Sequence, residues 1–420
     1  MFDWANSAYN LVITSTIFPA YYTAITTTAT GGDKVSFFGW QFVNTALSNY
    51  ALAFAYLIIV LLSPVLSSIA DYRGDKKIYM QLFTWLGAIS CCLLFFFKLD
   101  TLELGVLCFA LAAIGYAGGI VFYNSYLPEI ASEDQQDAVS ATGFSYGYVG
   151  SVVLQLICLV FVLKPEWFGI SDATFPARLS FLLVGLWWLV FAQIPFSVLP
   201  KGSPNFRAEV RQKVSSGFAE LGKVWSQLQQ MKELKSFLLA FFFYSMGVQT
   251  TMLAAAGFGA KVLHLPTSSL IITILIIQLV AIAGANLMSR LSRTYGNVQV
   301  LLSVVLVWIG ICIAAYFVQT LMHFYLLAAV VGLVMGGIQS LSRSTYSKFL
   351  PDNTPDTASF FSFYDVTEKL AIVAGLACFA YIEELTGSMR NSIIALTLFF
   401  ALGLVFLLSL KKASRQLNTK

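Results

Sequence analysis

Long apolar runs, interrupted by short polar segments, extend over almost the whole chain. Runs of about 20 apolar residues have the length that crosses a bilayer as a helix, and the chain holds twelve of them. A polar stretch, 200–233, separates the first six runs from the last six. The pattern predicts an all-α membrane protein with twelve transmembrane helices, near residues 4–28, 44–70, 77–97, 101–127, 138–163, 177–199, 235–258, 268–289, 298–319, 322–346, 357–382 and 391–410.

Composition indicates a lipid surrounding. Hydrophobic residues make up 58% of the chain and charged residues only 11%, whereas soluble proteins carry about 25% charged residues. The formal charge of +4 is small and gives no reason to expect a nucleic-acid partner. The six cysteines lie inside apolar runs without the paired spacing of a metal site. We expect neither a metal nor another cofactor, and the sequence shows no HExxH or phosphate-binding motif that would predict an enzyme.

Lysine and arginine are distributed unequally between the two sides of the predicted membrane. The side that holds the amino terminus receives 18 of the 25 basic residues, the other side receives 6, and Lys369 lies within a span. Positive charge marks the cytoplasmic side. We therefore expect both termini and the 200–233 segment in the cytoplasm, and we expect the membrane to be a bacterial inner (plasma) membrane.

The two halves of the chain are weak copies of each other. The segment SSIADYRG at 67–74 has a counterpart, SRLSRTYG, at 289–296, and the pattern Tyr-x-x-x-Leu-Pro at 123–128 recurs at 346–351. The two offsets are nearly equal, which indicates an internal duplication. We expect two six-helix bundles, 1–199 and 234–420, joined by a cytoplasmic amphipathic linker, 200–233, whose helix begins at Ser203-Pro204.

Charged residues inside predicted spans are rare and costly, and the eleventh span contains three of them. Asp365 and Lys369 are four residues apart, so they can meet on one face of a helix, and Glu368 lies beside them. One interpretation is a site for a charged group of a solute or for a proton. The other is a self-neutralising pair that holds neighbouring helices together.

The first span carries polar residues at helical spacing. Asp3, Asn6, Ser7 and Asn10 recur every three or four residues and form one stripe, which in lipid must face protein or water. The stripe is either a cavity wall that binds solute or a set of interhelical hydrogen bonds. The residues that we expect to bind solute are Asn6, Ser7, Asn10, Tyr146, Gln249, Asp365 and Lys369, and the candidates for proton coupling are Asp3, Asp365 and Glu368.

A charged hairpin joins the second and third spans. Gly74 lies where the chain turns tightly back and needs a residue that is free to take a positive φ. Charges at this cytoplasmic end can bridge to the other half in one state and release it in another. We therefore assign Asp71, Arg73, Gly74 and Lys76 to gating.

Six plus six spans with this hairpin and its echo resemble the major facilitator superfamily. The loop signature of that superfamily, G-x-x-x-D-[RK]-x-G-[RK]-[RK], is matched at Asp71, Gly74 and Lys76. The hairpin departs from the signature at Ser67, Tyr72 and Asp75.

A closer resemblance covers essentially the whole chain. It is to the UMF-one branch of the superfamily, which includes fungal autophagy-related vacuolar effluxers of amino acids. Members tend to carry an acid in the seventh span where Met246 stands here, so the expected acidic role shifts to the other spans. The segments that carry the resemblance are DWANSAYN at 3–10, ADYRGDKK at 70–77, FYNSYLPEIA at 122–131, GYVG at 147–150, GVQT at 247–250 and LSRSTYSKFLP with FFSFYD between 341 and 365.

The resemblance implies a major facilitator fold and a secondary transporter. We expect a monomer in the lipid bilayer that moves a small polar solute, an amino acid or a related metabolite, by alternating access, with the proton as candidate coupling partner. Transport of a nucleoside, sugar or lipid-like solute is an alternative, and so is a non-transporting membrane receptor or scaffold with the same fold. Architecture alone does not identify the solute.

Overall fold

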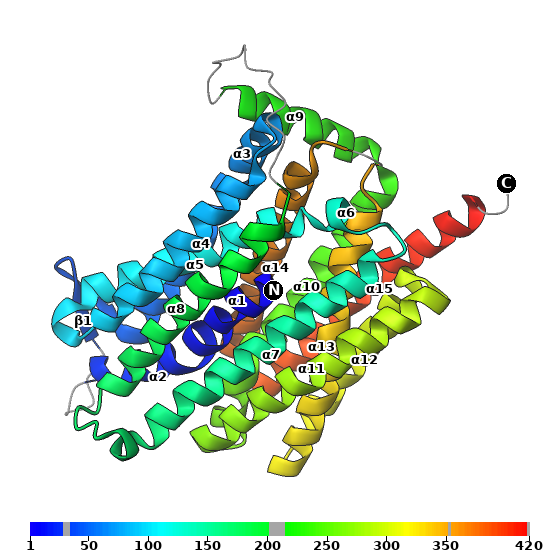
Figure 1. Cartoon of the computed structure of the whole chain (residues 1–420). Helices are drawn as coiled ribbons and strands as arrows, with labels where there is room; N and C mark the ends of the chain where they lie inside the picture. The colour runs from blue at the N-terminus through cyan, green and yellow to red at the C-terminus, as the bar shows by residue number, and fades with distance from the viewer. Residues whose placement is uncertain (28–33, 201–214, 352–353, 418–420) are drawn as a thin grey trace. The chain divides into compact units, whose positions relative to one another are not determined.

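The computed structural model describes residues 1–27, 34–200, 215–351 and 354–417 (Figure 1). Within these residues, ten helices are long and apolar enough to cross a membrane. Two further helical stretches bring the spans to twelve and confirm the predicted all-α architecture. They are α14 (Thr357–Thr386) and the opening stretch, which consists of α1 (Phe2–Ala8), η1 (Tyr9–Ile17) and α2 (Phe18–Thr26). These two are the spans in which the sequence predicts polar or charged faces.

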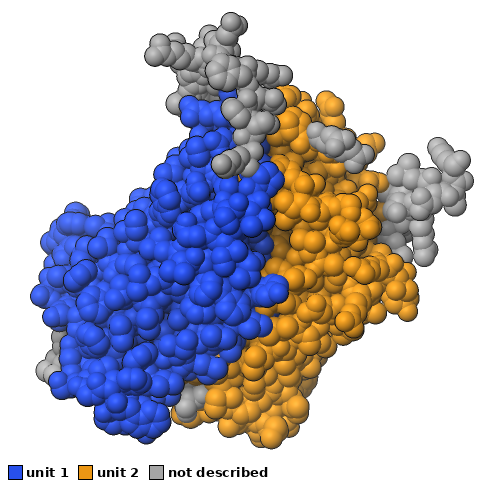
Figure 2. Space-filling model, viewed as in Figure 1, with its two compact units in different colours: residues 1–123, 146–212 blue, residues 124–145, 213–420 orange. Residues whose placement is uncertain are grey.

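Contacts divide the chain into two compact units, residues 1–123 with 146–212 and residues 124–145 with 213–420 (Figure 2). The segment 124–145 is therefore part of the second unit, although its neighbours in sequence belong to the first. Helix α7 (Gln136–Leu163) is continuous across this boundary. The predicted helix start at Ser203-Pro204 lies outside the described residues, and α9 (Ser215–Gln230) forms the described part of the linker helix.

In the first unit, helix α4 (Lys76–Leu93) packs against α8 (Phe175–Val198), and α1 also packs against α8. Small residues allow the close approach: a side chain added at Gly185 of α8 would come within 2.6 Å of the Ala88 carbonyl oxygen of α4. The further elements of this unit, besides the opening stretch and the later part of α7, are β1 (Lys34–Phe37), β2 (Trp40–Val43), α3 (Asn44–Arg73), α4 (Lys76–Leu93), η2 (Leu94–Phe96), η3 (Leu99–Thr101), α5 (Leu102–Asn124), η4 (Pro165–Phe168) and α8 (Phe175–Val198).

Large apolar side chains are exposed along one face of α3. Tyr50, Phe54, Leu57 and Leu61 are all exposed, and their spacing of three or four residues places them on one side of the helix. A contiguous apolar face of this kind is not stable in water. It is the face that this helix turns to lipid.

A short β-hairpin lies between the first and second spans. Strands β1 and β2 pair antiparallel, with Phe37 opposite Trp40. The two-residue turn has positive φ at Phe38 (48°) and at Gly39 (84°), which is the geometry of a type I′ turn. A bulky side chain is strained at such an angle, and the Phe38 ring is exposed at the tip.

The second unit repeats the pairing of the first. Helix α12 packs against α15 as α4 packs against α8, and α10 packs against α15 as α1 packs against α8. Because the third and ninth spans, and the first and seventh, have the same partners, the packing agrees with the predicted pseudo-repeat. The elements of this unit, besides α9, α14 and the start of α7, are α6 (Leu127–Ile130), α10 (Lys232–Val262), α11 (Thr267–Tyr295), α12 (Asn297–Phe317), α13 (Leu321–Lys348) and α15 (Met389–Leu417).

Candidate functional site

The charged residues of α14 form a connected cluster in the second unit. Nζ of Lys369 lies 3.1 Å from Oδ1 of Asp365 and 3.2 Å from Oε2 of Glu368. Nε2 of Gln249, on α10, donates a hydrogen bond of 2.8 Å to Oε1 of Glu368. The predicted i,i+4 pair is thus formed, and the structure brings four of the predicted residues together. We call Gln249, Asp365, Glu368 and Lys369 the α14 cluster.

Burial separates the members of the α14 cluster. Asp365 is 2% exposed and Lys369 is 6% exposed, whereas Glu368 and Gln249 are only half-buried. The second carboxylate oxygen of Asp365, Oδ2, is buried and has no hydrogen-bonding partner in the described part of the chain. Buried polar atoms are nearly always hydrogen-bonded, so this oxygen is the least satisfied position of the cluster.

The polar stripe of the first span lies mostly against protein in the first unit. Asp3 and Asn6 are buried, and the carboxylate of Asp3 accepts a hydrogen bond from the hydroxyl of Tyr123. The hydroxyl of Ser7 lies 3.4 Å from Oδ1 of Asn6. Asn10, at the far end of the stripe, is exposed. The stripe therefore forms an interhelical hydrogen bond at Asp3, whereas the amide of Asn10 at its other end is exposed.

Two glycines of α7 let this helix approach α1 closely. A side chain added at Gly147 would lie 2.6 Å from the hydroxyl of Ser7, and one added at Gly150 would lie 2.8 Å from the Trp4 carbonyl oxygen. Tyr146, the neighbour of Gly147, keeps an exposed ring. The predicted residues Ser7 and Tyr146 therefore lie near the same helix contact.

The π-helical segment η1 is a feature that sequence reasoning missed. A π-helix shifts carbonyl oxygens within reach of side chains five residues later, and the hydroxyl of Ser15 donates to the Asn10 carbonyl at 2.8 Å. The Thr16 hydroxyl lies 2.8 Å from Oε1 of Gln155 on α7. π-Helical turns are frequent at functional sites. The only local signal is the run of hydroxyl residues, which is also compatible with an ordinary helix.

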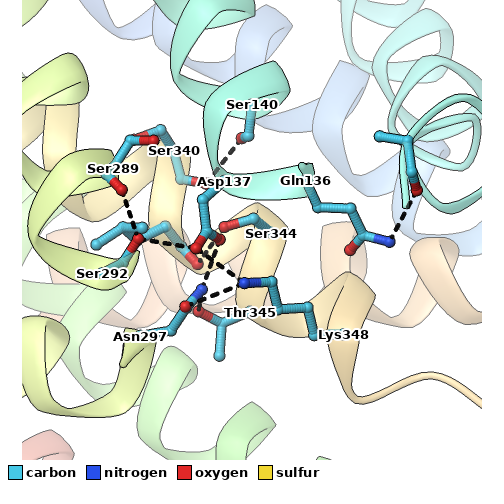
Figure 3. A network of polar contacts seen from close by, with 12 residues as sticks. Gln136, Asp137, Ser140, Ser289, Ser292, Asn297, Ser340, Ser344, Thr345 and Lys348 are labelled. Atoms are coloured by element: carbon cyan, nitrogen blue, oxygen red, sulfur yellow. Dashed lines mark hydrogen bonds and ion pairs between the residues drawn. The ribbon is translucent and has the colours of Figure 1, made fainter. Parts of the chain in front are cut away.

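A second polar network joins the start of α7 to α11, α12 and α13 within the second unit (Figure 3). The carboxylate of Asp137 accepts hydrogen bonds from Ser292 (2.8 Å), Asn297 (2.7 Å) and Lys348 (2.8 Å). These partners come from the end of α11, the start of α12 and the end of α13. One carboxylate therefore holds three helix ends together.

Arg343 of α13 forms the other half of this attachment. Its guanidinium donates to the hydroxyl of Ser140 and to the Ser140 carbonyl, both at 2.9 Å, and to Oδ1 of Asn124 at 3.2 Å. It also lies 4.4 Å from the centre of the Phe144 ring. The sequence holds a signal for this residue, because Arg343 falls inside the predicted tenth span, 322–346, where a charge is rare and costly.

The hairpin assigned to gating has the turn that the sequence predicts. Gly74 adopts φ 68° and caps α3 by donating its backbone N–H to the Asp71 carbonyl at 3.1 Å. Arg73 is the last residue of α3, and Lys76 begins α4. The gating role of these residues remains a prediction.

Twelve spans in two units with the same internal packing form the architecture of the major facilitator type. The chain belongs to the family described as "Vacuole effluxer Atg22 like", whose model matches residues 1–418. The chain is thus a multi-pass integral membrane protein of a transporter family and not an enzyme.

Individual relatives agree with this assignment. The chain is 32% identical to the uncharacterized MFS-type transporter YxiO of Bacillus subtilis over 97% of this chain and 92% of that protein. It is 28% identical to autophagy-related protein 22 of Cryptococcus neoformans over 60% of this chain, but the match spans only 46% of that longer protein. In fold, it is similar to the crystal structure of the human organic anion transporter MFSD10 (TETRAN), with a TM-score of 0.72 at 12% identity over 97% of this chain and 98% of that one.

Proposed function

We propose that this protein is a secondary transporter that moves a small polar solute, an amino acid or a related metabolite, across a membrane by alternating access. The observation that carries the proposal is the α14 cluster, because charged groups persist inside a membrane-spanning segment mainly where they bind a substrate, an ion or one another. The family description, which names an effluxer, supports transport. An amino acid offers both charges that such a cluster can recognise.

The other predicted roles belong to the same proposal. Asn6, Ser7, Asn10 and Tyr146 supply neutral hydrogen-bonding groups for the solute. Asp3, Asp365 and Glu368 are the candidates to carry a coupled proton. The hairpin of Asp71, Arg73, Gly74 and Lys76 acts in gating, and the protein works as a monomer in a bacterial inner membrane, with both termini in the cytoplasm.

The decisive experiment separates a transport role of the cluster from a structural one. Purified protein is reconstituted into liposomes, and counterflow of labelled amino acids, nucleosides and sugars is measured for wild type, Lys369→Met and the double variant Asp365→Asn/Lys369→Met. Removal of Lys369 alone leaves the buried carboxylate of Asp365 without its partner, which costs about 3–5 kcal/mol of stability. The double variant removes both charges of the pair and restores the charge balance.

The proposal expects the double variant to recover stability but not flux. A solute at 100 times its dissociation constant should stabilise wild type by about 2.7 kcal/mol and should leave the double variant unaffected. Full flux in the double variant would show that the pair is structural. Lys164→Met is the matched control, since Lys164 is an exposed lysine whose nearest carboxylate, that of Glu166, is 3.9 Å away.

A further inference from the structure

We infer that the α14 cluster recognises the ammonium group of the solute, through Asp365, and not its carboxylate. The inference rests on the proposed function and adds the chemical class of the solute group that this site recognises. It follows from which donors and acceptors of the cluster are already engaged, from its charge, and from the position of the unsatisfied oxygen.

The N–H donors of the cluster, on Lys369 and Gln249, face carboxylates of the protein itself. An ammonium group has three N–H donors, and the one on Lys369 lies within hydrogen-bonding distance of both Asp365 and Glu368. The Gln249 amide is directed to Glu368 as well. A solute carboxylate that approached Lys369 would compete with two carboxylates of the protein itself, those of Asp365 and Glu368.

One buried acceptor atom of the cluster has no hydrogen-bonding partner among the described residues. Both oxygens of Glu368 have partners, Gln249 on Oε1 and Lys369 on Oε2. Oδ1 of Asp365 is paired with Lys369, whereas Oδ2 is buried without a partner among the described residues. A lone-pair oxygen in this position can take only a donor, and a charged donor gives the stronger hydrogen bond.

The charged residues of the cluster also favour an ammonium group as the ligand. The cluster contains two acidic side chains, Asp365 and Glu368, and a single basic one, Lys369, so its composition favours a cation over an anion. The buried cation of the neighbouring helix, Arg343, is held by Ser140 and Asn124. Lys369 therefore acts as an internal counter-ion that positions Asp365, and a solute ammonium supplies the charge that the cluster lacks.

Three probes separate the two charges of an amino acid. Leucine carries both, leucinamide keeps the ammonium without a carboxylate, and N-acetylleucine keeps the carboxylate without an ammonium. Binding of each to the purified full chain in detergent is measured by thermal shift and by displacement of labelled leucine, and n-hexylamine is included as an ammonium without any amino-acid backbone. We expect leucinamide to bind within about tenfold of leucine and N-acetylleucine to lose at least about 30-fold, the size of one charge-assisted hydrogen bond.

Two variants with the same change of charge test whether the carboxylate of Asp365 binds the ammonium group. Asp365→Asn should lose at least about 30-fold in leucinamide binding. Glu383→Gln, at a carboxylate outside the cluster that lies 3.7 Å from Nζ of Lys261, should stay within about threefold. Equal losses in both variants would overturn the assignment to Asp365. The probe series on wild type tests the inference even if Asp365→Asn does not fold.

The remaining outcomes distinguish this inference from the proposed function. N-Acetylleucine binding as tightly as leucine would overturn the inference and leave amino-acid transport standing. Binding of n-hexylamine alone, lost in Asp365→Asn, would support the ammonium site and reject the amino acid as the solute. If no probe that carries an ammonium binds wild type, both are refuted.

Discussion

The attachment of the 124–145 segment to the second unit gives a prediction that can be worked out quantitatively. The perturbation is a double-mutant cycle on Asp137 and Lys348, with the substitutions Asp137→Asn and Lys348→Met. Both keep the size of the side chain and remove one charge. The side chain of Asp137 is 2% exposed and that of Lys348 is 18% exposed, so water screens their contact of 2.8 Å only weakly.

The magnitude follows from this geometry. A hydrogen bond to a charged group contributes about 1.5–3 kcal/mol net, and removal of one partner from a buried ion pair costs about 3–5 kcal/mol. Asp137 keeps Ser292 and Asn297 when Lys348 is lost, so we expect about 2–4 kcal/mol for each single variant. The double variant should cost less than the sum, with a coupling energy of about 1.5–3 kcal/mol.

Hydrogen exchange measured by mass spectrometry reports the local stability of the 124–145 segment. Peptides that cover 124–145 should exchange about 30-fold faster for each 2 kcal/mol of lost local stability, while peptides of the first unit stay protected. Lys164→Met serves as the control and should change nothing, because its lysine is exposed at the end of α7. Effects of the two single variants that add within about 0.5 kcal/mol would refute the reasoning, since independent sites add in this way.

Three further changes have defined outcomes. Phe38→Asn should relieve the positive φ at the hairpin tip and slow hydrogen exchange over 34–43 by an amount equivalent to about 1 kcal/mol; faster exchange would contradict the strain argument. Gly115→Ala places a methyl group 2.3 Å from a backbone nitrogen of α4 and should cost about 1–3 kcal/mol in thermal unfolding, whereas Gly310→Ala, with nothing within 4 Å, should be neutral or stabilising by up to about 1 kcal/mol. The pKa of Asp172 is held below its ordinary 3.8, mainly by a hydrogen bond from the hydroxyl of Thr174 and next by one from the Thr174 backbone N–H. The contribution of Asp172 to stability is therefore present above pH 3.8 and is lost as the pH falls through the lowered pKa. The melting temperature of Asp172→Asn should therefore decline less than that of wild type between pH 6 and pH 3, and parallel declines would exclude this role.

Features that depend on nearby residues could be predicted from the sequence. The spans follow from apolar runs, the positive φ of Gly74 from a tight turn between charged helix ends, and the ion pair of Asp365 and Lys369 from helical spacing. Each of these needs only the period of a helix and the length of a membrane span. The duplicated motifs extended this local information to the shared packing of the two units.

Features that depend on distant partners could not be predicted. Arg343 and Asn124 are 219 positions apart, and nothing near either residue in the sequence indicates the other. The position of Asp137 at the start of a span resembles an ordinary charged helix end until its partners are known. The π-helical segment was hidden for another reason, because hydroxyl side chains that bond to backbone carbonyls do not alter the hydrophobic period.

The placement of 124–145 in the second unit has a consequence for the synthesis of the protein. Ser140 and Arg343 are separated by 203 residues, and a ribosome that adds about 5–20 residues per second needs roughly 10–40 s to make that length of chain. During this time the fifth span has entered the membrane, but the groups that satisfy Asn124, Asp137 and Ser140 do not yet exist. The polar groups of the 124–145 segment therefore lack their final partners until α13 has been made, and a chain truncated before α13 would never supply the partners of Asn124 and Ser140 on Arg343.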